Sequence, residues 1–202
     1  MTYLIRPMQI ADIRQVMHIE RRSFTMPWPS FVYVHEINHN QAAYMGVIEI
    51  VDAAENEEKR FGLSRLWTRE VHSRTPLAAY GGIWMDGEEA HISTIASAPD
   101  YRGQGFGELM LIALIGRAIS MQRSRIVLEV RTSNEVAQKL YLKYQFTVLE
   151  TRYEYYPDNQ EDAYFMVLEG IDEVYRQMLA ERLAAFHDKL EFSDSFSGFI
   201  DA

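Results

Sequence analysis

The chain has 202 residues, enough for one domain with a sizeable core, and its 48% apolar and 24% charged residues are typical of a globular protein. It contains no cysteine, which excludes disulfides, thiolate metal sites and a cysteine nucleophile. The net charge of −9 argues against a general nucleic-acid-binding protein, which would need a basic face. That charge fits either a basic partner or simple solubility.

The N-terminus lacks the apolar run of a signal peptide. No stretch approaches the ~20 apolar residues that a membrane-spanning helix needs. We therefore expect a cytoplasmic protein without membrane contact.

Hydrophobic periodicity and turn residues predict the elements in chain order. Proline at positions 27 and 29 ends the first helix, Ser30 is expected to cap the second, and Asp86-Gly87 predicts a hairpin. Strands are expected over residues 2–6, 43–51, 78–85, 89–97, 125–131, 146–155 and 163–168, and helices over 12–22, 30–37, 105–120 and 134–144.

This order, β-α-α-β-β-β-α-β-α-β-β, predicts a mixed α/β sheet within a mostly antiparallel framework. Residues 52–76 turn from acidic to basic, so we expect an insertion or a mobile hairpin between two strands there, most simply a solvated segment. The predicted division is a domain over 1–170 that contains this insertion, and a C-terminal helix and tail over 171–202.

The predicted C-terminal helix is amphipathic, with apolar residues from Ile171 to Phe186 at helical spacing. That face can pack against the domain or form an oligomer contact, and the sequence leaves both open. From Phe192 the chain is rich in Ser, Asp and Gly, so we expect a frayed end.

A glycine-rich turn separates the strand over 89–97 from the helix that follows it. Glycines at 103, 105 and 107 let the backbone approach a ligand closely, and the free amides at the start of the helix attract anions. A phosphate-bearing ligand or a purely structural turn both fit. The loop lacks the Gly-Lys-Ser/Thr ending of a nucleotide-hydrolysing P-loop, and Glu108 stands where a Rossmann loop needs glycine.

Four segments of the chain resemble the motifs of a known family. Arg102, Gly105 and Gly107 fit the pattern [Q/R]-x-x-G-x-[G/A], and the run from Leu128 to Phe146 resembles L-E-V-R-x-S-N-x-x-A-x-x-L-Y…F. The other two segments are Phe24 with Pro27-Trp28, and Arg152 with Tyr155-Tyr156 and 162–168. Together they resemble the GNAT superfamily of acetyltransferases, and within it the RimI-type ribosomal-protein-alanine N-acetyltransferases.

The resemblance implies a GNAT fold, acetyl-CoA as co-substrate and direct transfer of the acetyl group within a ternary complex. It implies Glu129 as general base and Tyr141 as general acid. The coenzyme A contacts that it implies are Ile95, Ala96, Ser97, Arg102, Gly103, Gln104, Gly105, Phe106, Gly107, Glu108 and Asn134.

Judged by the residues alone, both catalytic assignments have simpler alternatives. Glu129 projects from mid-strand and could equally pair with Arg131 or another basic group. A tyrosine hydroxyl can return a proton to a thiolate, yet Tyr141 could also be a core residue. Asn134 is placed to cap the helix over 134–144. Family members commonly carry glycine where this chain has Gln145, which would have to adopt a left-handed conformation.

The acceptor is expected to be an α-amino group, because a lysine would cost about 3 kcal/mol more to deprotonate. Trp28, Tyr155 and Tyr156 are candidates for a peptide groove, or for packing alone. The resemblance implies the N-terminus of a ribosomal protein; a small amine acceptor and a non-catalytic acyl-CoA sensor are the alternatives. His91 and His187 lack the spacing of a metal site, so no metal is expected.

Overall fold

The computed structural model describes residues 1–51 and 75–199. The predicted insertion over 52–76 lies outside the described residues except for its last two positions. Its role therefore stays a prediction, as does the domain boundary that encloses it.

Apart from η1, η2 and β8, which the sequence did not predict, the described elements follow the predicted order, and their bounds agree with the predicted ones to within two residues. They are β1 (Thr2–Pro7), η1 (Ile10–Asp12), α1 (Ile13–Ser23), α2 (Ser30–Asn38), β2 (Ala43–Val51), β3 (Leu77–Asp86), β4 (Glu89–Ser97), η2 (Pro99–Tyr101), α4 (Phe106–Ser120), β5 (Arg125–Arg131), α5 (Glu135–Lys143), β6 (Thr147–Tyr156), β7 (Glu161–Leu168), α6 (Glu173–His187) and β8 (Glu191–Asp194).

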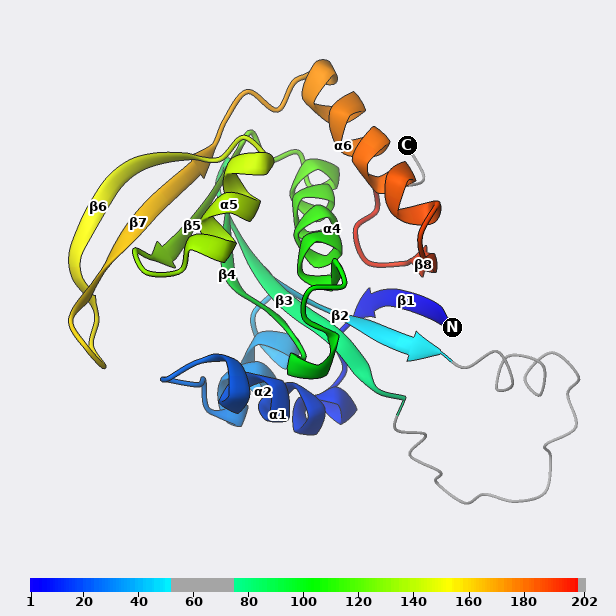
Figure 1. The fold of residues 1–202 in the computed structure, drawn as a ribbon, viewed down its shortest axis with the longest axis horizontal. Coiled ribbons are helices and arrows are strands. Elements are labelled where there is room, and N and C mark those ends of the chain that lie inside the picture. The colour runs from blue at the N-terminus through cyan, green and yellow to red at the C-terminus, as the bar shows by residue number, and fades with distance from the viewer. Residues whose placement is uncertain (52–74, 200–202) are drawn as a thin grey trace, which may run out of the picture.

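The strands form one sheet of eight, in the order β6-β7-β5-β4-β3-β2-β1-β8. Neighbours run antiparallel except for the pairs β4–β5 and β1–β8, which are parallel. The prediction of a mixed, mostly antiparallel sheet is therefore confirmed. The hairpin of β6 and β7 projects from the rest of the molecule (Figure 1).

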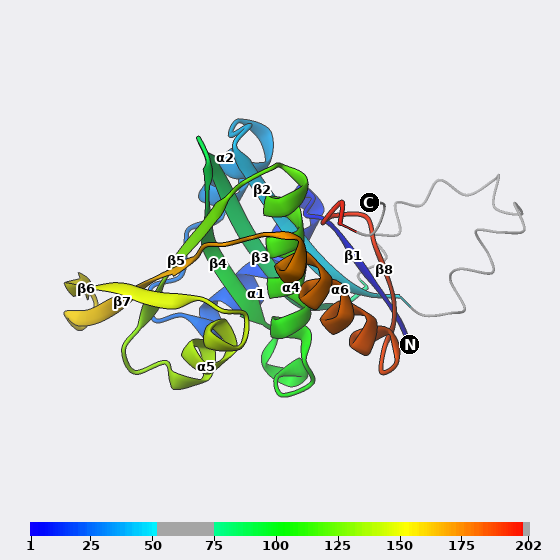
Figure 2. The same ribbon diagram turned by 90° about the horizontal axis from the view of Figure 1, so that it is seen from above.

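Helices cover both faces of this sheet. α1 and α2 lie on one face, and α4, α5 and α6 lie on the other (Figure 1). α4 is apolar almost all round, and such a helix needs cover on every side. Its inner side packs on the central strands, while α6 runs along its outer side (Figure 2). Tyr175, Leu179 and Leu183 of α6 join the same core, so the apolar face of the C-terminal helix is used within the chain.

The expectation of a frayed end after Phe192 is wrong. β8 pairs in parallel with β1 and extends the sheet by one strand. Phe192 and Phe196 are buried in the main core, and the Phe196 ring lies where a Cβ on Gly46 would be 3.0 Å away. Two buried aromatic rings outweigh the polar, glycine-rich composition on which the expectation was based.

Two local predictions have different outcomes. Ser30 does not cap α2: the N-cap residue is Pro29, without a side-chain hydrogen bond, and Ser30 is the first helical residue. Gln145 does adopt the left-handed conformation, with φ of +64°, and it ends α5 where glycine would be easier to accommodate. Gly87 has φ of +55° in the turn between β3 and β4, which fits the predicted hairpin.

We expect Phe196→Ala to destabilise the chain by about 3–5 kcal/mol, because it empties a fully buried site. Urea unfolding of the full-length protein measures this change. Phe31→Ala is the matched control, since the Phe31 side chain is 69% exposed and should change stability little. Equal unfolding midpoints for the two variants would mean that the tail is not part of the folded core.

Candidate active site

The centre of the site is the place where β4 and β5 separate. Their parallel ladder comprises only three residue pairs and ends at His91 and Val127. Beyond it, both strands continue without pairing to each other, while β4 remains paired to β3. A β-bulge at Ser93 shifts the β3–β4 register at the same level. The two strands therefore leave a gap at which backbone groups of β4 lack a partner on the β5 side.

At the far end of this gap, the glycine loop leads into α4. Gly105, the N-cap of α4, has φ of +91°, and Gly103 has φ of +74°, conformations that favour glycine. The first helical amide bond within α4 is donated by Leu109, so the amides of Phe106, Gly107 and Glu108 precede it. These amides and the helix dipole can attract an anion, and the binding of a diphosphate there stays a prediction.

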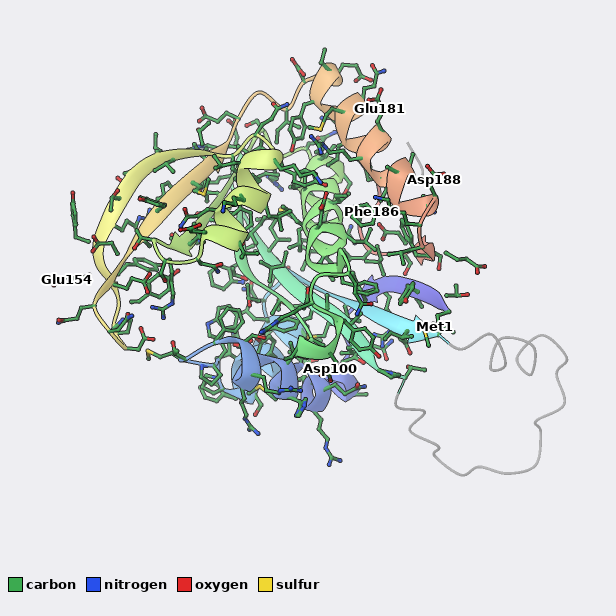
Figure 3. The ribbon with its side chains drawn as sticks, in the orientation of Figure 1. Met1, Asp100, Glu154, Glu181, Phe186 and Asp188 are labelled. Atoms are coloured by element: carbon green, nitrogen blue, oxygen red, sulfur yellow. The ribbon has the colours of Figure 1, made fainter. Side chains whose placement is uncertain are left out.

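Phe186 of α6 packs behind this loop. A Cβ added to Gly105 would lie 3.0 Å from the ring of Phe186. Figure 3 shows Phe186 between α4 and the end of α6. The C-terminal helix therefore limits the space at the glycine loop, a contact that the sequence did not predict.

The polar side chains of the glycine loop and the first turn of α4 form hydrogen bonds within the protein. Arg102 donates to the Ser23 hydroxyl at 2.9 Å, and Gln104 donates to the Asp100 carbonyl. Glu108 accepts hydrogen bonds from Lys143 and from the Tyr144 hydroxyl. For a diphosphate, the loop thus offers main-chain amides, whereas these three side chains fix the loop.

Ile95, Ala96 and Ser97 form the last part of β4. Their partners on β3 are Gly81, Tyr80 and Ala79. The opposite edge of this stretch faces the gap. Its backbone can therefore pair with an extended, amide-containing ligand, which fits the predicted binding of the pantetheine arm.

Glu129 lies on β5, two residues beyond the last β4–β5 pair, and its side chain is only 9% exposed. One carboxylate oxygen, Oε2, lies 2.6 Å from His91 Nε2, and the other, Oε1, accepts a hydrogen bond from Arg152. The expected pairing with a basic group is confirmed, but the partners are Arg152 and His91, because Arg131 bonds to Asp158 and Glu161. Arg152 also covers the ring of Phe165.

Aromatic rings line the face of the sheet beside Glu129. Trp28 stacks on Trp84 with ring centroids 5.9 Å apart, and the His91 ring meets Trp84 edge-on. The indole of Trp84 donates to Glu36, which fixes its orientation. The sequence predicted Trp28 here but gave no role to Trp84. The alternation of β3 and β4 could have placed Trp84 and His91 together, because they are register partners.

Tyr141 lies on α5, on the opposite face of β5, and is almost fully buried. Burial, followed by the nearby Tyr156, raises the pKa of Tyr141 above its ordinary value. Burial likewise raises the pKa of Tyr156 to about 12, against the effect of Arg131 and together with those of Tyr155 and Glu129. Tyr156 is thus close enough to affect the pKa of Tyr141, and its own pKa is affected by Glu129.

Asn134 and Tyr155 stand apart from this buried group. The Asn134 side chain caps α5 by accepting from the Ala137 amide at 3.2 Å, as predicted from its position. Tyr155 is 42% exposed and meets the Tyr156 ring edge-on. Neither residue contacts Glu129 or the glycine loop through a hydrogen bond within the described ranges.

The turn between β6 and β7 is tied to both neighbouring segments. Arg131 bonds to Asp158 and Glu161, and Asp158 also accepts from Thr25 in the α1–α2 loop. Hydrogen bonds from Ser133 and Arg131 lower the pKa of Glu161 to about 2. This network connects the α1–α2 loop to the projecting hairpin.

In residues 1–51 and 75–199 there is no cluster of acidic and histidine side chains that could hold a metal ion. Within the same ranges, no helix is long and apolar enough to cross a membrane.

Glu161 should make stability depend on pH in the acidic range. Its pKa is lowered by folding, so its contribution is complete above pH 4.5, the ordinary value, and disappears as the pH falls towards 2. We expect thermal unfolding to show a lower midpoint for Glu161→Gln than for the native protein at pH 6, with the gap closing near pH 2. Glu135→Gln, at a 74% exposed carboxylate, should show no such gap; a constant gap for Glu161→Gln would contradict the assignment.

Comparison with known proteins agrees with this geometry. The sequence profile of the acetyltransferase (GNAT) family matches residues 13–146. A candidate ribosomal protein bS18-alanine N-acetyltransferase of Bacillus subtilis is 36% identical over 162 residues, which cover 80% of this chain and 92% of that protein.

Solved structures agree as well. The ribosomal-protein-S18-alanine N-acetyltransferase of Escherichia coli matches with a TM-score of 0.64 and 25% identity, covering 85% of this chain and 97% of that one. A NatC complex bound to Gag peptide and CoA shares the fold, with a TM-score of 0.63 at 18% identity, covering 84% and 99%. The chain therefore belongs to the GNAT family and is an acetyl-CoA-dependent N-acetyltransferase.

Proposed function

We propose that this enzyme acetylates the N-terminal α-amino group of a protein, with a ribosomal protein as the first candidate. The observation that carries the proposal is the placement of Glu129, a shielded carboxylate beside the gap between β4 and β5. The relatives in Bacillus subtilis and Escherichia coli, which are named for acetylation of an N-terminal alanine of bS18, support the choice of acceptor.

Coenzyme A fits the residues at the gap. The amides of Phe106, Gly107 and Glu108 are arranged to bind its diphosphate, and the free edge of Ile95–Ser97 can pair with the amides of its arm. Acetyl-CoA supplies an activated acetyl group as a thioester. The remaining steps require the protein to deprotonate the amine, to hold it and to assist the leaving sulfur.

Glu129 is our candidate for the base. An α-amine has an ordinary pKa near 7.7–8.0, so a carboxylate needs to remove a proton from only part of the amine population at neutral pH. The proton of the ammonium moves to a Glu129 oxygen, and the amine nitrogen keeps the electron pair. Trp28, Trp84 and the tyrosines at 155 and 156 offer apolar surfaces for the first residues of a peptide.

Tyr141 is our candidate for assisting the sulfur. Its raised pKa keeps the hydroxyl protonated throughout the neutral range, as a proton donor to the thiolate requires. Its burial also keeps water away from that side of the site. Asn134 holds the start of the same helix, α5, and so contributes to the position of Tyr141.

A thiol-release assay with acetyl-CoA tests the proposed acceptor. The panel contains a peptide with the bS18 N-terminal sequence, the same peptide with a blocked N-terminus, a peptide with an internal lysine only, and spermidine. We expect turnover with the free N-terminal peptide alone. Preferred turnover of spermidine would overturn the peptide assignment, and no association with coenzyme A in calorimetry would overturn the cofactor site.

Single substitutions test the two catalytic assignments. Glu129→Gln should lower kcat by about 10²–10⁴, the usual contribution of a general base, without weakening coenzyme A binding. Glu135→Gln is its control on an exposed carboxylate, and activity like that of the native enzyme in both variants would exclude Glu129 as the base.

Tyr141→Phe should lower kcat while the KM for the peptide stays nearly constant. Tyr153→Phe is its control, because the Tyr153 side chain is 79% exposed. Unchanged kcat in Tyr141→Phe would leave that residue with a packing role only.

A further inference from the structure

The His91 ring occupies a defined position at the edge of the gap. Its Nε2 lies 2.6 Å from Glu129 Oε2, and its side chain is 29% exposed. Within the described part of the chain, Glu129 is the only hydrogen-bond partner of the ring. A carboxylate can only accept hydrogen bonds, so the Nε2 atom carries the proton. His91 is also the last β4 residue in the ladder with β5, so the strand pairing itself fixes its backbone.

The surroundings of His91 come from four elements. Trp84 of β3 meets the ring edge-on, and Glu36 of α2 lies behind Trp84 as the acceptor of its indole N–H. Glu129 of β5 supplies the carboxylate that faces the ring. Arg152 of β6 is the nearby cation, and it donates a hydrogen bond to the other oxygen of Glu129. The ring is therefore held by an aromatic side chain and a carboxylate, with one arginine beyond that carboxylate.

We propose that His91 is a positioning residue for Glu129, an inference that rests on the proposed role of Glu129 as base. The imidazole donates Nε2–H to one oxygen while Arg152 donates to the other. The carboxylate plane is thereby fixed, and its remaining lone pairs are presented to the substrate ammonium. One N–H bond of the ammonium breaks, one O–H bond forms on Glu129, and the proton passes to water after the transfer.

Two substitutions at His91 separate the hydrogen bond from the packing of the ring. His91→Leu removes the donor, and we expect kcat to fall about 10- to 100-fold, as for a lost hydrogen bond to a charged group, with an unchanged KM for acetyl-CoA. His91→Gln keeps an amide N–H near the Nε2 position and should recover most of kcat. His18→Leu, on the exposed side of α1, is the matched control and should keep the native kcat.

A readout without turnover separates this inference from the proposed function. Nitrogen chemical shifts of His91 at pH 8 should place the proton on Nε2 in the native protein, and Glu129→Gln should weaken that tautomer preference. Identical shifts in the two proteins would overturn the inference whatever the assay gives. So would native kcat in His91→Leu, or a loss of kcat in His91→Gln as large as in His91→Leu, while Glu129→Gln is inactive. Full activity of Glu129→Gln would instead overturn the proposed base, and His91 would lose its role with it.

Discussion

The short parallel ladder between β4 and β5 is the constraint on which the site depends. Three residue pairs hold the two strands together, and after His91 and Val127 they separate. The bulge at Ser93 reverses the direction of successive side chains on β4, so Ile92 contributes to the core around α4 and Ala96 to the core around α1 and α2. As a result, a backbone edge, an acid and a helix N-terminus all reach one gap from a continuous sheet.

The C-terminal segment supports this gap from behind. α4 presents its N-terminal amides to the ligand side, yet its body is apolar all round and cannot be left in water. α6 covers it, and Phe186 reaches the glycine loop itself. Residues beyond position 146, where the family profile ends, are thus in direct contact with the loop that is proposed to bind coenzyme A. The packing of α6 on α4 therefore supports both the folded state and the proposed coenzyme A site.

The charges at the site are arranged for chemistry more than for stability. Removing the Glu129 carboxylate from water is costly, and ion pairs of buried groups often contribute little to folding. Both oxygens of Glu129 are nevertheless paired, one with Arg152 and the other with His91. At the turn between β6 and β7, Arg131 pairs with Asp158 and Glu161, whose side chains are somewhat more exposed than that of Glu129. The two arginines therefore serve different purposes, because Arg152 holds the proposed base and Arg131 fixes a turn.

Sequence patterns alone determined the element order, the sheet type and the glycine loop, because periodicity, proline, glycine and the hairpin dipeptide act over a few residues. The resemblance also selected Glu129, Tyr141 and Trp28, whose roles stay proposals. The partners of Glu129 required the tertiary structure: His91 and Arg152 are 38 and 23 residues away from it, and only strand register decides which cation reaches an acid. The ordered tail likewise depended on long-range burial, since Phe192 and Phe196 find their places in the core only when β8 pairs with β1 at the other end of the chain.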